Sequence, residues 1–170
     1  SLMMKKIKVV FVVPTLDKGG AERVLVNLVN QFDRSVIEPV IFCLEKKGAL
    51  LANVANDVRI VDIRSPRLYF SIFRLRKEFK KHKPDLVFGW MGHINAYLAF
   101  CSHFFLRDVK LLCRESSIPS QFISHYRFPG LFRYLHKFYN RFSTIICQSV
   151  AMKDDLVQSF KVKPDKIKVI

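Results

Sequence analysis

The sequence predicts a doubly wound α/β fold, in which seven parallel strands form a Rossmann-like sheet with helices on both faces. Seven short runs rich in β-branched and apolar residues recur along the chain, and segments with helical spacing lie between them. The run at residues 9–13 is apolar at every position. A half-exposed strand would alternate with polar residues, so this pattern indicates a central parallel strand covered on both faces.

The predicted strands begin with this apolar run and continue to the end of the chain. Pro84 and Pro164 stand just before the fourth and the last of them. Proline ends a preceding helix and favours an extended start, so both positions mark a transition from helix to strand. The seven predicted strands are residues 7–13, 36–44, 58–63, 86–88, 110–113, 144–147 and 167–170.

Helices are predicted between the strands. From Ala21 to Phe32, apolar residues recur at helical spacing, with charged and amide side chains on the other face. No internal linker is visible, which predicts one domain over residues 1–170. Further helices are expected at 48–56, 68–82, 94–106, 130–142 and 151–160.

The chain is strongly basic. Its 170 residues include 29 Lys and Arg against 14 Asp and Glu, a formal net charge of +15 at pH 7. This excess predicts attraction to phosphate groups in nucleic acids, lipid headgroups or nucleotides. The apolar fraction of 50% excludes intrinsic disorder.

Cysteine spacing and hydrophobic runs exclude further classes of protein. None of the four cysteines forms a C-x-x-C pair, so no metal site is predicted and the thiols are expected to be buried and reduced. No apolar run approaches the ~20 residues of a membrane span, and no signal peptide is visible, which predicts a cytoplasmic protein. Ser1 and Leu2 are interpreted as a cloning remnant before a natural start at Met3 or Met4.

Two adjacent glycines follow the first predicted strand. Gly19 and Gly20 stand directly before the amphipathic helix, where a ligand could approach the backbone and an anion would meet free N–H groups. The alternative interpretation, given equal weight, is a loop that only turns the chain into the helix. G-x-G-x-x-G and the P-loop pattern are both absent, which argues against nicotinamide, flavin and P-loop nucleotide sites.

Several runs of the sequence resemble the N-terminal half of family 4 glycosyltransferases of the GT-B fold, in a subgroup with Gly-Gly-Ala-Glu-Arg after the first strand. The longest is KIKVVFVVPTLDKGGAERVLVNLVN at residues 6–30. Shorter runs are PDLVFGWMGHIN at 84–95, LCRESS at 112–117, SVAMKDDL at 149–156 and PDKIKVI at 164–170. The resemblance covers nearly the whole chain.

This resemblance implies one half of a two-domain enzyme. In such enzymes the first domain mainly holds the acceptor, and the second holds the nucleotide-sugar donor and carries paired glutamates. The chain is therefore expected to be the acceptor-side domain, inactive alone. Its parent would transfer a sugar with retention from a UDP- or GDP-sugar to a glycan or lipid-linked acceptor in cell-envelope polysaccharide synthesis. No permanently bound cofactor or metal is implied.

The resemblance also implies roles for individual residues. It places the backbone amides before the first helix near the donor diphosphate. His93 would hydrogen-bond the acceptor or the transferred sugar, with a satisfied histidine at a helix start as the equal alternative. Arg114 would bind phosphate and Glu115 would orient a sugar hydroxyl, against the alternative of a local ion pair. The implied catalytic residues are His93 and Glu115, and the implied substrate-binding residues are Gly19, Gly20, Asn95 and Arg114.

The positive charge is concentrated in two segments. Residues 67–83 contain seven Lys or Arg and one acid, and residues 116–153 contain no acid. Basic residues beside exposed aromatics are typical of helices in a membrane interface, although a solvated basic face over an aromatic core is equally ordinary. We expect segments 67–83 and 119–142 to dock on anionic lipid at the inner face of the plasma membrane. The predicted membrane contacts are Arg74, Lys77, Lys81, Arg133, Lys137 and Arg141.

Two other functions stay open at this point. Interleaved basic and aromatic residues could bind nucleic acid, but no recognised motif is present and the aromatics fall at helical positions, so no nucleic-acid partner is expected. A non-catalytic Rossmann-like adaptor would require a gene that ends near Ile170. The expected partners are therefore a nucleotide-sugar, a glycan or lipid-linked acceptor and an anionic membrane.

Overall fold

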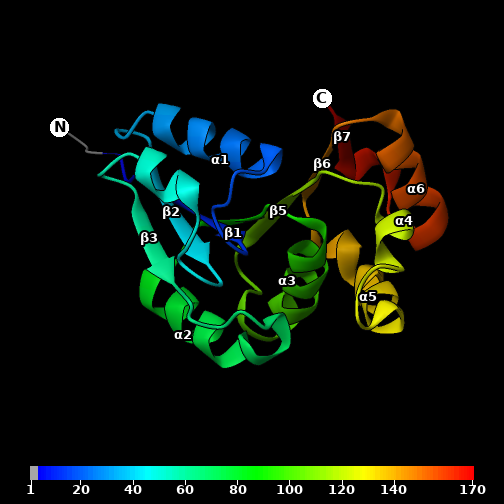
Figure 1. Ribbon diagram of the computed structural model, residues 1–170. Coiled ribbons are helices and arrows are strands. Elements are labelled where there is room, and N and C mark those ends of the chain that lie inside the picture. The colour runs from blue at the N-terminus through cyan, green and yellow to red at the C-terminus, as the bar shows by residue number, and fades with distance from the viewer. Residues whose placement is uncertain (1–3) are drawn as a thin grey trace. The chain divides into compact units, whose positions relative to one another are not determined.

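The computed structural model describes residues 4–170, and the interpretation of Ser1 and Leu2 as a remnant lies outside them. Within these residues the chain forms a seven-stranded parallel sheet with flanking helices, a Rossmann-like α/β fold that confirms the predicted class (Figure 1). The chain divides into two compact units, the first up to Phe88 and the second from Gly89.

The first unit is built around β1, whose central residues are almost completely buried. Its strands have the order β3-β2-β1-β4, and β1 pairs in parallel with β2 from Ile7 opposite Ile37 to Val13 opposite Cys43. Helices α1 and α2 lie on opposite faces of these strands (Figure 1). The elements are β1 (Ile7–Val13), α1 (Gly20–Gln31), β2 (Ile37–Cys43), η1 (Ala49–Asn53), β3 (Arg59–Asp62), η2 (Leu68–Phe70), α2 (Ile72–His82) and β4 (Leu86–Gly89).

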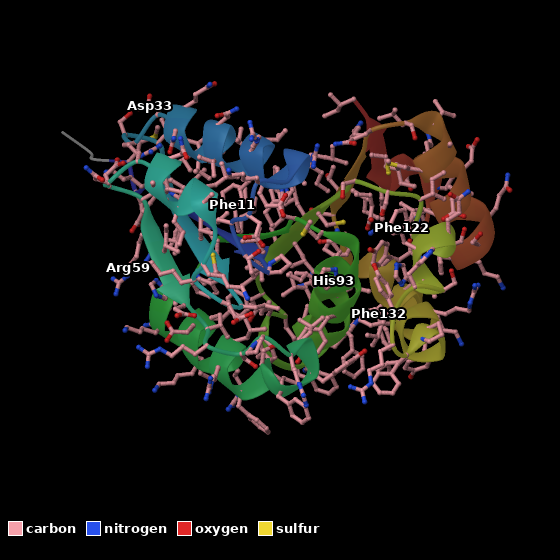
Figure 2. All side chains as sticks on the ribbon, viewed as in Figure 1. Phe11, Asp33, Arg59, His93, Phe122 and Phe132 are labelled. Carbon is pink, nitrogen blue, oxygen red and sulfur yellow. The ribbon has the colours of Figure 1, made fainter. Side chains whose placement is uncertain are left out.

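Phe11 shows why the first predicted strand lacks polar residues. Its ring is 1% exposed and lies 6.1 Å from the ring of Phe32 and 5.5 Å from that of Phe88 (Figure 2). Val10 and Val12, on the opposite face of the strand, are also buried. Both faces of β1 are therefore covered, as predicted.

The second unit contains the strands β5, β6 and β7, paired in parallel in that order. Leu112 lies opposite Thr144, and Ile145 lies opposite Ile167. The elements are α3 (Gly92–Phe105), β5 (Lys110–Glu115), α4 (Pro119–Ile123), α5 (Pro129–Leu135), η3 (His136–Arg141), β6 (Thr144–Cys147), α6 (Val150–Phe160), η4 (Pro164–Lys166) and β7 (Ile167–Val169).

Several predicted helices are shorter or divided in the structure. The helix predicted at 48–56 is the 3₁₀ turn η1, and the one predicted at 130–142 is divided into α5 and η3. The short helix α4 was not predicted. Pro119 and Pro129 begin α4 and α5, at a position where proline's missing N–H costs nothing.

The buried face of α1 also differs from the predicted one. Glu22, Leu25, Val26 and Val29 are buried, whereas Val24, predicted on the buried face, is 45% exposed. The spacing is still helical, but the face is rotated so that a glutamate lies at its first turn. Apolar periodicity alone could not place a charged residue on that face.

Within the described residues, no helix combines the length and apolar character that a membrane crossing requires. The four cysteines are buried and unpaired, as predicted. Among residues 4–170, no cluster of three or more histidine, cysteine or acidic side chains could hold a metal ion.

Candidate functional site

A cluster of polar side chains lies where β5 ends and α3 begins, inside the second unit. Glu115 is the last residue of β5 and is fully buried. Alternation along the strand places it on the same face as the buried residues Leu111 and Cys113. The alternation of buried and partly exposed residues along β5 therefore places the Glu115 carboxyl group in the protein interior.

Two side chains donate hydrogen bonds to this carboxyl group. The hydroxyl of Tyr139 and Nδ2 of Asn95, at 3.3 Å, both donate to Oε1 of Glu115. The other oxygen, Oε2, is buried and has no partner among residues 4–170. Burial raises the pKa of Glu115 to about 7, although both hydrogen bonds act in the opposite direction. A substantial fraction of Glu115 is therefore protonated at neutral pH.

Asn95 connects the first turn of α3 to the end of β5. Its side chain is fully buried, and Nδ2 also donates to the backbone oxygen of Arg114 at 2.9 Å. A Cβ atom on Gly89 would lie 2.3 Å from Oδ1 of Asn95, so only glycine leaves room for this amide. Oδ1 has no partner within the described part of the chain. The predicted substrate-binding amide is thus held in the protein interior.

His93 stands in the same first turn and is partly exposed, on α3 (Figure 2). Its ring makes an edge contact with Tyr126 at a centroid distance of 6.0 Å. Desolvation lowers the pKa of His93, which favours the neutral imidazole. A neutral imidazole can donate one hydrogen bond and accept another, which suits a ligand rich in hydroxyl groups.

Arg114 points to the opposite face of β5 from Glu115. Its guanidinium carbon lies 5.2 Å from the ring centroid of Trp90, a cation–π contact. No ion pair joins Arg114 to Glu115, so the expected alternative of a local ion pair is not found in the described residues. One guanidinium nitrogen, Nη1, is buried without a partner among residues 4–170.

Three buried polar atoms at the end of β5 therefore lack a partner in the described chain. They are Oδ1 of Asn95, Nη1 of Arg114 and Oε2 of Glu115. Buried polar atoms are nearly always paired, because an unpaired one costs about 1–3 kcal/mol. An ordered water or the polar groups of a ligand would satisfy them. The two oxygens lie in the cluster around Glu115, and the guanidinium nitrogen lies on the opposite face of β5.

The glycine loop belongs to the first unit. Gly19 is the N-cap of α1, and a Cβ atom there would lie 2.1 Å from Oε2 of Glu22. A Cβ atom on Gly20 would meet nothing within 4 Å. The space beside Gly19 is therefore taken by a carboxyl group of the helix itself, and the space beside Gly20 is open to a ligand.

The predicted membrane contacts of α2 are exposed. Lys77 and Lys81 face solvent, and Arg74 donates from Nη1 to the backbone oxygens of Ile63 and Arg64. Two phenylalanines beside them are exposed to an unusual degree, Phe70 by 70% and Phe73 by 80%.

The predicted membrane contacts of the second unit differ from one another. Arg133 and Lys137 are exposed. Arg141 donates from Nη2 to the backbone oxygens of Leu106, at 2.6 Å, and Val109, at 2.9 Å. Its guanidinium thus holds the loop after α3, a contact that charge patterning could not indicate.

Tyr139 is the main residue of the cluster that sequence reasoning missed. It lies in the segment predicted as one basic helix at 130–142, and it is fully buried. Its buried hydroxyl donates a hydrogen bond to Glu115, which lies on β5 and is distant in the sequence. No local pattern carries that information.

Comparisons with known proteins agree with this fold. The sequence profile described as Glycosyltransferase Family 4 matches residues 18–170. HepE from Anabaena, solved in complex with UDP-glucose, is 20% identical over 96% of this chain and 43% of its own, with a TM-score of 0.72. The lipopolysaccharide outer core galactosyltransferase WaaB, in its apo form, is 15% identical over 96% of this chain and 45% of its own, with a TM-score of 0.69.

A similar fold also occurs in enzymes of another class. UDP-GlcNAc 2-epimerase from Neisseria meningitidis, bound to UDP-GlcNAc, is 15% identical over 96% of this chain and 46% of its own, with a TM-score of 0.62. The chain thus spans less than half the length of these structures. No curated protein matches the sequence.

Proposed function

The chain belongs to glycosyltransferase family 4, and on that premise we propose that it is the acceptor-side domain of an enzyme that transfers a sugar from a nucleotide-sugar. The observation that carries the proposal is the set of buried polar atoms at the end of β5, from Asn95, Arg114 and Glu115, that lack partners in the described chain. HepE, of similar fold, is bound to UDP-glucose, which supports a UDP-sugar as the first donor to test, with GDP-sugars second. We further propose the Gly-Gly-Ala-Glu-Arg subgroup, transfer with retention, and a glycan or lipid-linked acceptor.

His93 and Arg114 are the residues that we propose to contact the substrates. His93 is partly exposed and its lowered pKa favours a neutral ring, which supports a hydrogen bond to the acceptor or the transferred sugar. Arg114 is partly exposed and would provide donors for a phosphate. The complete burial of Glu115 supports a positioning role instead of direct contact, shared with Asn95.

In the first unit, we propose that the amide groups beside Gly20 approach the donor diphosphate. The open space at Gly20 supports this role, and oriented N–H groups would stabilise the charge of the leaving diphosphate. Gly20→Val would fill that space. We expect the full-length protein to lose about 100-fold in turnover while the fold is kept, and Gly19→Val to act in the same direction after displacing Glu22. Near-normal turnover of both folded variants would contradict the assignment.

The direct test is nucleotide release by the full-length protein in which we place this domain. With a panel of UDP- and GDP-sugars and glycan or lipid-linked acceptors, we expect acceptor-dependent release of one nucleotide. The chain alone should release none. His93→Ala should lower turnover at least tenfold, whereas His103→Ala, a matched change at an exposed position of the same helix, should not. Failure of every donor to react would overturn the proposal.

We also propose that the protein is cytoplasmic and binds the inner face of the plasma membrane through α2. The exposed rings of Phe70 and Phe73 beside Lys77 and Lys81 support this role. Each such lysine would contribute about 1 kcal/mol near an anionic leaflet. Flotation with phosphatidylglycerol vesicles should therefore succeed, and Phe73→Ser should weaken it. Equal binding to neutral vesicles, or salt-sensitive RNA binding in its place, would contradict it.

A further inference from the structure

A basic hollow lies within the second unit, on α5, η3 and the end of α6. Its volume is about 410 Å³, within the range of small-molecule pockets. Its lining residues are Arg133, Lys137, Asn140, Ser159, Phe160 and Lys161.

The lining has three cationic side chains and no carboxylate. None of Arg133, Lys137 and Lys161 forms an ion pair within residues 4–170. Two hollows of the first unit differ in this respect, because acids lie among their cations. One contains Asp62 and Glu78, and the other contains Glu38 and Asp85. The hollow on α5, η3 and α6 thus combines concave shape with positive charge that the lining itself does not neutralise.

The nearby acid Asp155 is already satisfied by hydrogen bonds. It accepts from the backbone N–H of Ser120 at 2.9 Å, from the hydroxyl of Ser120, and from the hydroxyl of Ser159 at 3.1 Å. The C-terminal end of α6 contributes a partial charge of about −0.5. Asp155 keeps its negative charge, but three full positive charges exceed that charge and the helix partial charge together, so an anion is still favoured.

The framework of the hollow is fixed before any ligand binds. Phe160 is only 8% exposed and forms one wall, with the guanidinium carbon of Arg133 6.0 Å from its ring centroid. Asn140 donates from Nδ2 to the backbone oxygen of Lys161 at 3.1 Å and accepts at Oδ1 from the N–H of Lys163 at 2.9 Å. This clamp holds the loop that carries Lys161, so little ordering is needed on binding.

We propose that this hollow binds a phosphoryl group, presented either by a soluble phosphate ester or by a phospholipid headgroup. The planar fork of Arg133 matches phosphate oxygens, and Lys137 and Lys161 add point charges. The site lies apart in the sequence from the His93 and Glu115 cluster, and its occupation does not depend on sugar transfer.

The test uses the full 170-residue chain, labelled for NMR, and inorganic pyrophosphate as the probe at physiological ionic strength. We expect saturable shifts of the amides of Arg133, Lys137 and Lys161. The double variant R133Q/K137Q should weaken binding about tenfold or more. The matched double variant K110Q/K168Q, which loses the same charge at exposed positions of the same unit, should bind within about twofold of the parent chain.

A second variant separates charge from packing. Lys161→Asn removes a cation but keeps a residue that tolerates the left-handed backbone at this position, where φ is 56°. It should also weaken binding, without any loss of the Arg133 contact with Phe160. Thermal melts should show all variants folded.

A parallel arm with vesicles identifies the source of the phosphoryl group. Weaker binding of R133Q/K137Q to phosphatidylglycerol vesicles, with pyrophosphate unaffected, would assign the hollow to a headgroup. The reverse result would assign it to soluble esters, and loss of both would mean that it accepts either. Equal weakening of R133Q/K137Q and K110Q/K168Q with both probes, or shifts that avoid the three lining cations, would overturn the proposal.

Discussion

Each of the two units places a glutamate carboxyl group against a glycine at the start of a helix, but the two carboxyl groups are held in different ways. Glu22 lies on α1 itself, three residues after Gly19, whose missing side chain it covers. Glu115 reaches Gly92 from β5, and a Cβ atom on Gly92 would lie 3.1 Å from its Oε2. The first contact is local in sequence and the second is tertiary. Only the second requires the unit to be fully folded.

The largest expected effect on stability comes from removing the carboxyl group of Glu115, and removal of the Glu22 carboxyl group is the comparison. Glu115→Ala removes the acceptor of hydrogen bonds from the Tyr139 hydroxyl and the Asn95 amide and creates a cavity in the interior. It should lower the free energy of unfolding by about 3 kcal/mol. Glu22→Ala removes a charge at a helix N-terminus and should cost about 1 kcal/mol or less. Urea unfolding followed by circular dichroism measures both, and equal losses would break the comparison.

The pH dependence of stability sharpens the comparison. Glu115 has a folded-state pKa of about 7, above the ordinary value, so its contribution is complete below pH 4 and declines as the pH rises to 7. The total decline is roughly 3 kcal/mol. His136 opposes it, because its pKa is lowered to about 4 and stability from this group rises with pH up to its ordinary value.

The contribution of Glu115 to the pH dependence can be separated from that of His136 by comparing the parent chain with a variant that lacks the Glu115 titration. Glu115→Gln keeps the shape and removes the titration, so the free energy of unfolding of the parent chain minus that of this variant should fall from pH 4 to pH 7. A flat difference for Glu115→Gln would mean that the pKa of this carboxyl group is the same in the folded and the unfolded chain.

The smallest expected effect concerns the glycines. Gly92→Ala brings a Cβ atom within 3.1 Å of a buried oxygen and should cost about 1 kcal/mol. Gly20→Ala meets open space in a helix and should be neutral or stabilising by up to about 1 kcal/mol. The midpoint of thermal unfolding should therefore fall for Gly92→Ala. For Gly20→Ala it should stay unchanged or rise. Destabilisation by Gly20→Ala alone would show that the space beside it is not free.

The fold could be predicted because its signals are local. The fully apolar run that contains Phe11 indicated a strand covered on both faces, and Pro84 stands just before β4 as predicted. Pro164 instead begins the 3₁₀ turn η4, and β7 follows that turn. The helix that begins at the paired glycines could be predicted for the same reason, since its pattern lies in consecutive residues. Helix lengths around Pro129 were less accurate, because a continuous apolar spacing does not reveal a change from α to 3₁₀ geometry.

The arrangement of the candidate site could be predicted only in part. The resemblance led to His93, Asn95, Arg114 and Glu115 as separate candidates, and the structure joins Asn95 to the last two. That Glu115 is buried and bonded to Tyr139 depends on packing between distant segments. Periodicity reports which face of an element is apolar, but it does not report which polar groups meet across elements.

Gly48 has a consequence for the loop that carries the paired glycines. With φ at 122°, it lets the chain pass so close to Leu16 that a side chain would lie 2.2 Å from the Leu16 carbonyl oxygen. Leu16 donates its N–H to Lys47 at 2.9 Å and accepts from Leu50 at 3.0 Å. Backbone hydrogen bonds thus hold the base of the loop, at Leu16, to the segment that contains Lys47 and Leu50. Any movement of the glycine loop would therefore have to begin after Leu16, which leaves only a short segment before α1.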